Sequence, residues 1–147
     1  FGIQHGGHIE KYKCEDADLI ILSMGTIGSE AKLAVDSLRK QGRKVGAARV
    51  RVFRPFPKDE VMSIAENAQM LTVIDRQVFY GMEGPLHTEV KASLYSKEDS
   101  PLTAGFIEGL GGRDVKISDI EMMVNKSLKY LQAGKVEREV EWVGLRE

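Results

Sequence analysis

The sequence predicts an α/β domain with three layers, in which helices cover both faces of a mixed, mostly parallel sheet. Short apolar runs alternate with amphipathic stretches of about ten to fifteen residues, which is the pattern of βα units. The chain has 147 residues, of which 42% are hydrophobic. This is enough material for one hydrophobic core, so we expect a single domain.

The first βα unit is predicted near the start of the chain. Residues 17–25 (ADLIILSMG) form an apolar run that ends in glycine, as expected of a strand buried on both faces. Residues 29–41 predict a helix, and Gly42 supplies the left-handed residue that ends it. The apolar face of this helix has helical spacing and consists of Ala31, Ala34, Val35 and Leu38.

A second unit follows directly. Residues 44–53 predict a strand, which Pro55 and Pro57 end because a proline nitrogen cannot donate to a sheet. Pro57 suits the first turn of a helix, and Asp59 and Glu60 then lie where the helix dipole favours negative charge. The expected apolar face of this helix is Val61, Ile64, Ala65 and Ala68.

Two further strands and one helix are expected in the next part of the chain. Residues 70–75 (MLTVID) and 103–109 (TAGFIEG) both read as buried strands. Between them, Gly81, Gly84 and Pro85 interrupt the chain before a helix. The apolar face of that helix is Leu86, Val90 and Leu94.

The last predicted element is a helix that ends at Gly134. Ser118 and Glu121 have the spacing of a capping box, in which each residue satisfies a backbone N–H group at the start of a helix. The side chains expected to face the core are Ile120, Val124, Leu128 and Leu131.

The two ends of the chain are less regular. Residues 8–12 could add a strand to the sheet, in either direction. We assign residues 1–134 to the domain and residues 135–147 to a charged tail, which is either a solvated terminus or a docking segment built around Trp142. Because the first residue is Phe1 rather than methionine, we expect a processed product or an excised domain.

The composition excludes several classes of function. Lys and Arg number 21 against 22 for Asp and Glu, a net charge of -1, so we expect no nucleic-acid partner. Apolar runs are far too short to cross a bilayer, so we expect no membrane partner. Cys14 is the only cysteine, which rules out an internal disulfide and a thiolate-held iron-sulfur cluster within this chain, and favours a cytoplasmic location.

Candidate binding groups lie in the loops that follow the strands, because open α/β sheets bind ligands beyond the carboxyl ends of their strands. The loop GTIGSE lacks the glycine spacing of a nucleotide fingerprint, which favours a simple turn. Three arginines leave strand ends, namely Arg54, Arg76 and Arg113. They either converge on one anion or pair locally with Asp59, Asp75 or Asp114.

The sequence predicts no catalytic residue and no metal site. His5 and His8 offer two possible ligands but no third, and His87 is expected at a surface or an interface. Ser23 lacks the glycines of a nucleophile elbow. Cys14 is followed by acidic residues, which disfavour a reactive thiolate.

Four segments, taken together in order and spacing, resemble the 2-oxoacid:ferredoxin oxidoreductases. They are FGIQHGGHIEKYKCEDADLIILSMGT, RKVGAARVRVFRPFP, VIDRQVFYGMEGPLHTEV and IEGLGGRDV. The resemblance covers residues 1–131 and is closest to the alpha subunit of pyruvate:ferredoxin oxidoreductase (pyruvate synthase) or of the related 2-oxoisovalerate enzyme. Where family members often place a capping threonine after GGRDI, this chain has Lys116, so the capping role is expected to pass to Ser118.

The resemblance implies a fold like the C-terminal domain of transketolase, with a five-stranded mixed sheet that contains one antiparallel strand. It also implies a parent enzyme that converts a 2-oxoacid and coenzyme A to an acyl-CoA and carbon dioxide while reducing ferredoxin, with pyruvate as the expected substrate. Such an enzyme would use thiamine diphosphate, magnesium, iron-sulfur clusters and coenzyme A. None of these is expected within this chain, which lacks the G-D-G motif of the family's thiamine-binding subunit.

These observations lead to two hypotheses. The favoured one is a non-catalytic accessory domain that contacts other domains and subunits of the oxidoreductase, and reaches ferredoxin only through the whole complex. In it, Gly111 and Gly112 of GLGGRDV belong to a loop that contacts a neighbouring domain or subunit. The alternative is a free-standing domain that binds a small anion or a nucleotide at the three arginines.

Overall fold

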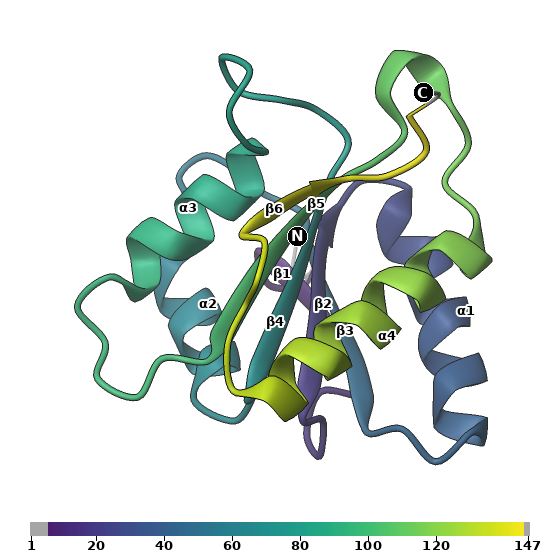
Figure 1. The fold of residues 1–147 in the computed structure, drawn as a ribbon. Helices are drawn as coiled ribbons and strands as arrows, with labels where there is room; N and C mark the ends of the chain where they lie inside the picture. Colours follow the sequence, from purple (N-terminus) through teal and green to yellow (C-terminus); the bar gives the residue numbers. More distant parts are fainter. Residues whose placement is uncertain (1–5, 146–147) are drawn as a thin grey trace, which may run out of the picture.

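The fold is a mixed sheet of six strands in the order β1-β3-β2-β4-β5-β6, as seen in a computed structural model that describes residues 6–145 (Figure 1). The strands are β1 (Ile9–Tyr12), β2 (Leu19–Met24), β3 (Val45–Val50), β4 (Met70–Asp75), β5 (Leu102–Ile107) and β6 (Val140–Trp142). The helices are α1 (Ile27–Lys40), α2 (Lys58–Ala65), α3 (Pro85–Leu94) and α4 (Ile117–Ala133), with a short 3₁₀ turn, η1 (Leu110–Gly112). The predicted α/β class is confirmed.

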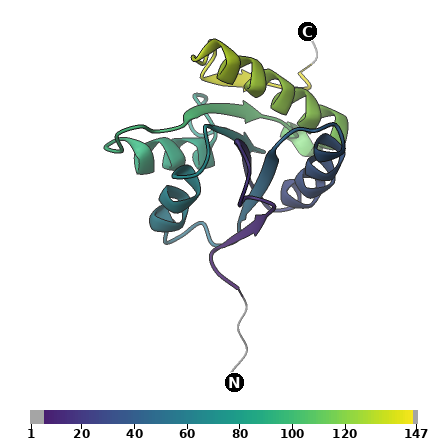
Figure 2. The same cartoon turned by 90° about the horizontal axis from the view of Figure 1, so that it is seen from below.

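The helices form two layers, one on each face of the sheet (Figures 1 and 2). Alternation along β2 shows how the strands serve both layers: Leu19 and Ile21 pack with α1 and α4, whereas Ile20 and Leu22 pack with α2 and α3. All four side chains are at most 1% exposed. Since a strand buried on both faces cannot alternate apolar and polar residues, it reads as the continuous apolar run seen in the sequence.

The direction of the first strand is settled by its pairing. β1 runs antiparallel to β3, with Ile9 opposite Val50 and Tyr12 opposite Ala47. Every other pair of neighbouring strands is parallel. The sheet is therefore mixed, with one antiparallel edge strand, as expected.

The count of five strands was wrong, because the charged tail supplies a sixth. Residues 140–142 form β6, which pairs with β5 in the parallel direction. The amide of Gly105 donates to Glu139 O at 2.8 Å, and that of Val143 donates to Ile107 O at 2.9 Å. The tail is thus part of the sheet over these residues and not a solvated terminus.

The start of α4 also differs from the prediction. The helix begins at Ile117, one residue before the expected cap Ser118, and the side chain of Asp119 accepts a hydrogen bond from Lys116 N at 3.2 Å. The carboxylate of Asp119 therefore satisfies the helix start that we assigned to Ser118 and Glu121. The end at Gly134, with φ of 68°, is as predicted.

Candidate functional site

The carboxyl ends of β2, β4 and β5 lie side by side at one end of the sheet, where the fold class predicts a binding site. Two small cavities of about 270 and 310 Å³ lie beside these strand ends, and Thr26 and Arg76 line both. Glu30 and Asp114 line the smaller one. Any ligand in that cavity would meet two acidic side chains as well as the guanidinium.

Arg76 connects the loops that follow β2, β4 and β5 through hydrogen bonds. Its guanidinium donates to Thr26 Oγ1 at 3.2 Å, to Gly109 O at 3.4 Å and to Arg113 O at 2.6 Å. Gly109 has a φ of 77°, and a Cβ atom there would lie 2.8 Å from Arg76 Nε. The first glycine of GLGGRD is therefore required by its own chain, because it lets the loop close over Arg76.

The other two glycines of the motif have a different role. Gly111 and Gly112 have φ values of 67° and 79°, and a Cβ atom at either position would meet nothing within 4 Å. Glycine is favoured at these two positions by the positive φ values and not by a lack of space for a side chain. Arg113, which follows them, donates to Gly144 O and so joins this loop to the end of β6.

The structure brings Arg76 and Arg113 together but places Arg54 elsewhere. Arg54 Nη2 lies 2.6 Å from Glu89 Oε1, on the outside of α3, and its guanidinium carbon lies 4.2 Å from the centre of the Phe53 ring. The local partners expected for the three arginines, Asp59, Asp75 and Asp114, were wrong. The observed partners are Glu89 and Phe53 O for Arg54, Thr26 Oγ1 and two backbone carbonyls for Arg76, and one backbone carbonyl for Arg113.

Asp75 is a buried carboxylate at the end of β4, with 1% of its surface exposed. It accepts hydrogen bonds from the amides of Leu86 and His87, both at 3.0 Å, and so caps the start of α3 from a distance along the chain. Burial raises the pKa of Asp75 from 3.8 to about 6, although the two amides oppose this shift. Gly84 is required beside it, because a Cβ atom at that position would lie 2.0 Å from Asp75 Oδ2.

His87 is buried, with 1% exposure, so the expectation of a surface or interface histidine was wrong. Its ring packs against Gly105 of β5, and its Nδ1 lies 2.9 Å from Glu83 Oε2 without hydrogen-bonding geometry. Burial lowers the pKa of His87, which keeps the ring neutral.

Ligand atoms of Glu83, His87 and Glu139 all lie within 4.8 Å of one another, a spacing that could hold a cation. The ammonium group of Lys91 already lies among them, 2.8 Å from Glu83 Oε2 and 2.5 Å from Glu139 Oε1. A metal ion would have to displace this lysine. The prediction that the chain uses no metal therefore stays a prediction, with Lys91 as its support. His5 lies outside the described residues, and His8 contacts Glu60 at 2.8 Å.

A second buried carboxyl group, Glu108, lies directly after β5 and is 4% exposed. Burial and its contact with the Asp119 carboxylate raise the pKa of Glu108 to about 7, while Arg76 opposes the shift. A buried carboxyl group beside another carboxylate binds its proton more tightly than one in water. This contact connects the residue after β5 to the first turn of α4.

Glu108→Gln is expected to make the protein more stable than the wild type above about pH 7 and equally stable near pH 4.5. The pKa in the folded protein lies above the ordinary value of 4.5, so wild-type stability is lost as the pH rises from 4.5 to about 7. Glutamine can donate to Asp119 as the protonated acid does, but it does not titrate. Urea unfolding at both ends of this window measures the difference.

The exposed Glu98→Gln variant serves as the control and should follow the wild type at every pH. A Glu108→Gln variant whose stability relative to the wild type is the same at both ends of the window would contradict the assignment.

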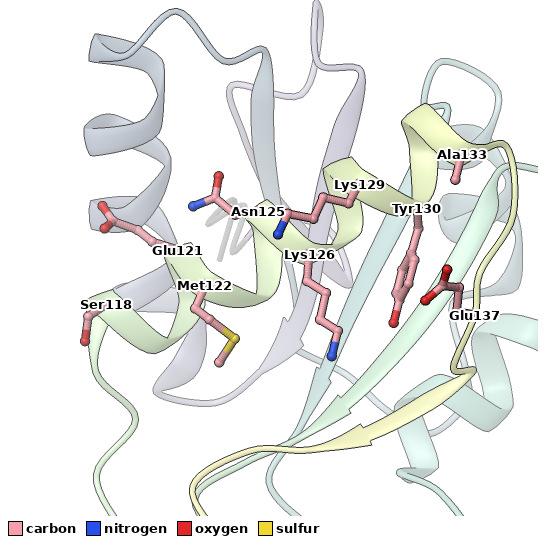
Figure 3. Close-up of a pocket in the computed structure, with 9 residues that line it drawn as sticks. All are labelled: Ser118, Glu121, Met122, Asn125, Lys126, Lys129, Tyr130, Ala133 and Glu137. Carbon is pink, nitrogen blue, oxygen red and sulfur yellow. The ribbon is translucent and has the colours of Figure 1, made fainter.

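A groove of about 560 Å³ follows the outer face of α4 (Figure 3). Lys126 Nζ and Tyr130 OH, which both point toward β6, donate to the buried carboxylate of Glu141. Burial and this carboxylate raise the pKa of Tyr130 to about 12. The groups lining the groove that could bind a ligand are therefore partly used to hold β6 against α4. This contact could not be predicted from the sequence, because it depends on the strand in the tail.

Comparisons with known proteins place this geometry in a family. Residues 17–120, more than half of the chain, match the family model "Pyruvate:ferredoxin oxidoreductase core domain II". The chain is 44% identical over 146 residues to ketoisovalerate oxidoreductase subunit VorA of Pyrococcus abyssi, covering 99% of this chain and 37% of that protein. It is 40% identical over 138 residues to pyruvate synthase subunit PorA of Pyrococcus furiosus, covering 94% of this chain and 35% of that protein. The chain thus spans little more than a third of the length of these relatives.

Solved structures support the fold. A 2-oxoglutarate:ferredoxin oxidoreductase from Magnetococcus marinus matches 84% of this chain and 20% of its own, with a TM-score of 0.61 and 17% identity. A transketolase from Pichia stipitis matches 87% of this chain and 19% of its own, with a TM-score of 0.58 and 18% identity. The transketolase-like fold expected from the sequence is confirmed. The loops that Arg76 joins and the glycines that shape them thus lie in a chain that belongs to the core domain II family of the pyruvate:ferredoxin oxidoreductases.

Proposed function

We propose that this chain is a non-catalytic accessory domain that builds interfaces within a thiamine-diphosphate-dependent 2-oxoacid:ferredoxin oxidoreductase. The observation that carries the proposal is that Arg76, Arg113 and Asp75, at the carboxyl ends of the strands, are already bonded within the chain. Arg76 and Arg113 donate to backbone carbonyls, and Asp75 accepts from the start of α3. Groups satisfied in this way position loops and are poorly placed to bind a cofactor or a substrate.

The residues present do not fit the cofactors that the family implies. An iron-sulfur cluster needs several thiolates, whereas the only cysteine, Cys14, is buried and its thiol contacts Ala47 O at 3.2 Å. Thiamine diphosphate and coenzyme A carry phosphates, but the cavity beside Arg76 is also lined by Glu30 and Asp114. The separate position of Arg54 likewise argues against the alternative of an anion site shared by three arginines.

The parent enzyme, in this proposal, uses thiamine diphosphate, magnesium and iron-sulfur clusters to convert a 2-oxoacid and coenzyme A to an acyl-CoA and carbon dioxide, with electrons passing to ferredoxin. The partners of this chain are then other domains and subunits of that complex, in the cytoplasm. Pyruvate is the expected substrate, and 2-oxoisovalerate is the competing one, because relatives named for both match. Among the helices of the described residues, none has the length and apolar character needed to cross a bilayer.

Two measurements test the proposed function. The 147-residue chain by itself should not reduce ferredoxin with pyruvate or 2-oxoisovalerate, whereas the complete complex that contains it should. Calorimetry of the chain with thiamine diphosphate and magnesium, with coenzyme A, or with ATP should show no micromolar binding. Turnover by the chain alone, or micromolar binding of any of these compounds, would refute the accessory role.

A further inference from the structure

A short hairpin projects from the fold between β4 and α3, as the teal loop above α3 in Figure 1. The amide of Phe79 donates to Glu83 O at 2.7 Å, and that of Met82 donates to Phe79 O at 3.1 Å. The two residues at the tip, Tyr80 and Gly81, have positive φ values of 46° and 72°. This is the geometry of a tight turn between two antiparallel segments. We call residues 79–83 the aromatic hairpin.

The side chains of the aromatic hairpin face solvent. Phe79 is 54% exposed, Tyr80 is 88% exposed and Met82 is 75% exposed. The rings of Phe79 and Tyr80 meet edge to face, with centroids 4.6 Å apart. Three large apolar side chains in water at one tip are unusual for a free surface and typical of a contact site, where aromatic residues and methionine are enriched.

Tyr80 lies in a backbone conformation that suits asparagine, aspartate or glycine much better than tyrosine. Within residues 6–145, the tyrosine ring is 88% exposed, and its neighbour Phe79 is its one aromatic contact. Tyrosine at this position therefore does not stabilise the fold of the isolated chain. A partner that buries the ring would supply one.

The base of the aromatic hairpin is held firmly. Glu83 accepts from Thr88 Oγ1 at 3.0 Å and lies 2.8 Å from the ammonium of Lys91. On the other side of the loop, Asp75 accepts from the start of α3. A rigid base means that little conformational entropy is lost when the tip docks, which favours binding.

We propose that the aromatic hairpin docks through Phe79, Tyr80 and Met82 into an apolar pocket on another domain of the same full-length subunit. The proposal rests on the proposed function. Relatives of this chain extend well beyond the matched region, since the 146 matched residues make up 37% of the VorA subunit of Pyrococcus abyssi. Stable interfaces between separate proteins bury roughly 1,200–2,000 Å² in total, more than three side chains provide. A domain tethered on the same chain needs less, because its effective concentration is high.

The test uses the complete, active oxidoreductase carrying either Tyr80→Cys or Tyr95→Cys in its full-length subunit. Tyr95 is 93% exposed and lies after α3, away from the tip, so it reports an open site on the same domain. The native Cys14 is buried and gives little background in this region. We expect a maleimide, followed by mass spectrometry of peptides, to label position 80 at least about tenfold more slowly than position 95.

A second arm keeps an aromatic ring at the tip by placing p-benzoylphenylalanine at position 80 of the complete complex. Irradiation should give a crosslink to the same subunit, outside residues 1–147. A crosslink to a different subunit, no crosslink, or equal labelling of positions 80 and 95 overturns the docking proposal. If the complex assembles and turns over without these 147 residues, the proposed function fails instead.

Discussion

Asp75→Ala is expected to lower the free energy of unfolding by about 3 kcal/mol, because it leaves two buried amide groups without an acceptor. These amides belong to Leu86 and His87 at the start of α3, and each donates to the carboxylate at 3.0 Å. Neither can turn to water, since Leu86 and His87 are at most 1% exposed. The helix would therefore begin with unsatisfied donors inside the core.

The cost of Asp75→Ala should depend on pH. The folded-state pKa of about 6 lies above the ordinary value of 3.8, so the contribution of Asp75 is largest near pH 4 and falls as the pH rises to 6. Chemical denaturation of both proteins across this range measures the change. Asp75→Asn, which keeps one acceptor oxygen, should lose less stability than alanine at pH 4. A loss below about 1 kcal/mol for alanine at that pH would show that the capping bonds contribute little.

Gly105→Ala is expected to destabilise the protein by a similar amount, about 3 kcal/mol, through overpacking. A Cβ atom at this position of β5 would lie 2.6 Å from Nδ1 and 2.8 Å from Cγ of His87. Neither side can give way easily, because β5 is paired on both edges and the His87 side chain is buried between α3 and β5. The clash would push α3 away from the sheet.

A double variant separates this clash from a general intolerance of alanine in the strand. His87→Ala removes the ring that the new methyl group would meet, so Gly105→Ala should cost at least about 1 kcal/mol less in that background. Thermal or urea unfolding of the four proteins gives the coupling. Gly42→Ala, where φ is 81° and a Cβ atom meets nothing within 4 Å, is the control and should show only the backbone cost of about 1 kcal/mol. Additive losses for Gly105 and His87 would contradict the proposed contact.

The regular elements could be predicted because their signals are local. Buried parallel strands appear as apolar runs, and α1 shows its buried face in the spacing of Ala31, Ala34, Val35 and Leu38. The family resemblance, which rested on motifs spread along the chain, was confirmed by the match to residues 17–120. The class of fold thus followed from patterns within each segment, and the family from the order and spacing of several segments.

The partners within the candidate site could not be predicted, because they come from distant parts of the chain. Arg76 binds carbonyls more than thirty residues away, where the sequence suggested the nearest carboxylates. His87 is buried because Gly105 leaves room for its ring, a relation that no local pattern reveals. The strand β6 is three residues long and includes Glu141, so its apolar signal is too weak to separate it from a charged tail.

The position of β6 has a consequence for where this domain can be cut. β5 carries β4 on one edge and β6 on the other, and the amide of Gly105 and the carbonyl of Ile107 pair with the tail. A protein shortened to residue 134 would leave this row of backbone groups bare along a strand that is otherwise apolar. Such an open edge recruits strands from other molecules, so the truncated protein would be prone to aggregation. Residues 139–143 therefore protect this edge of the sheet from self-association.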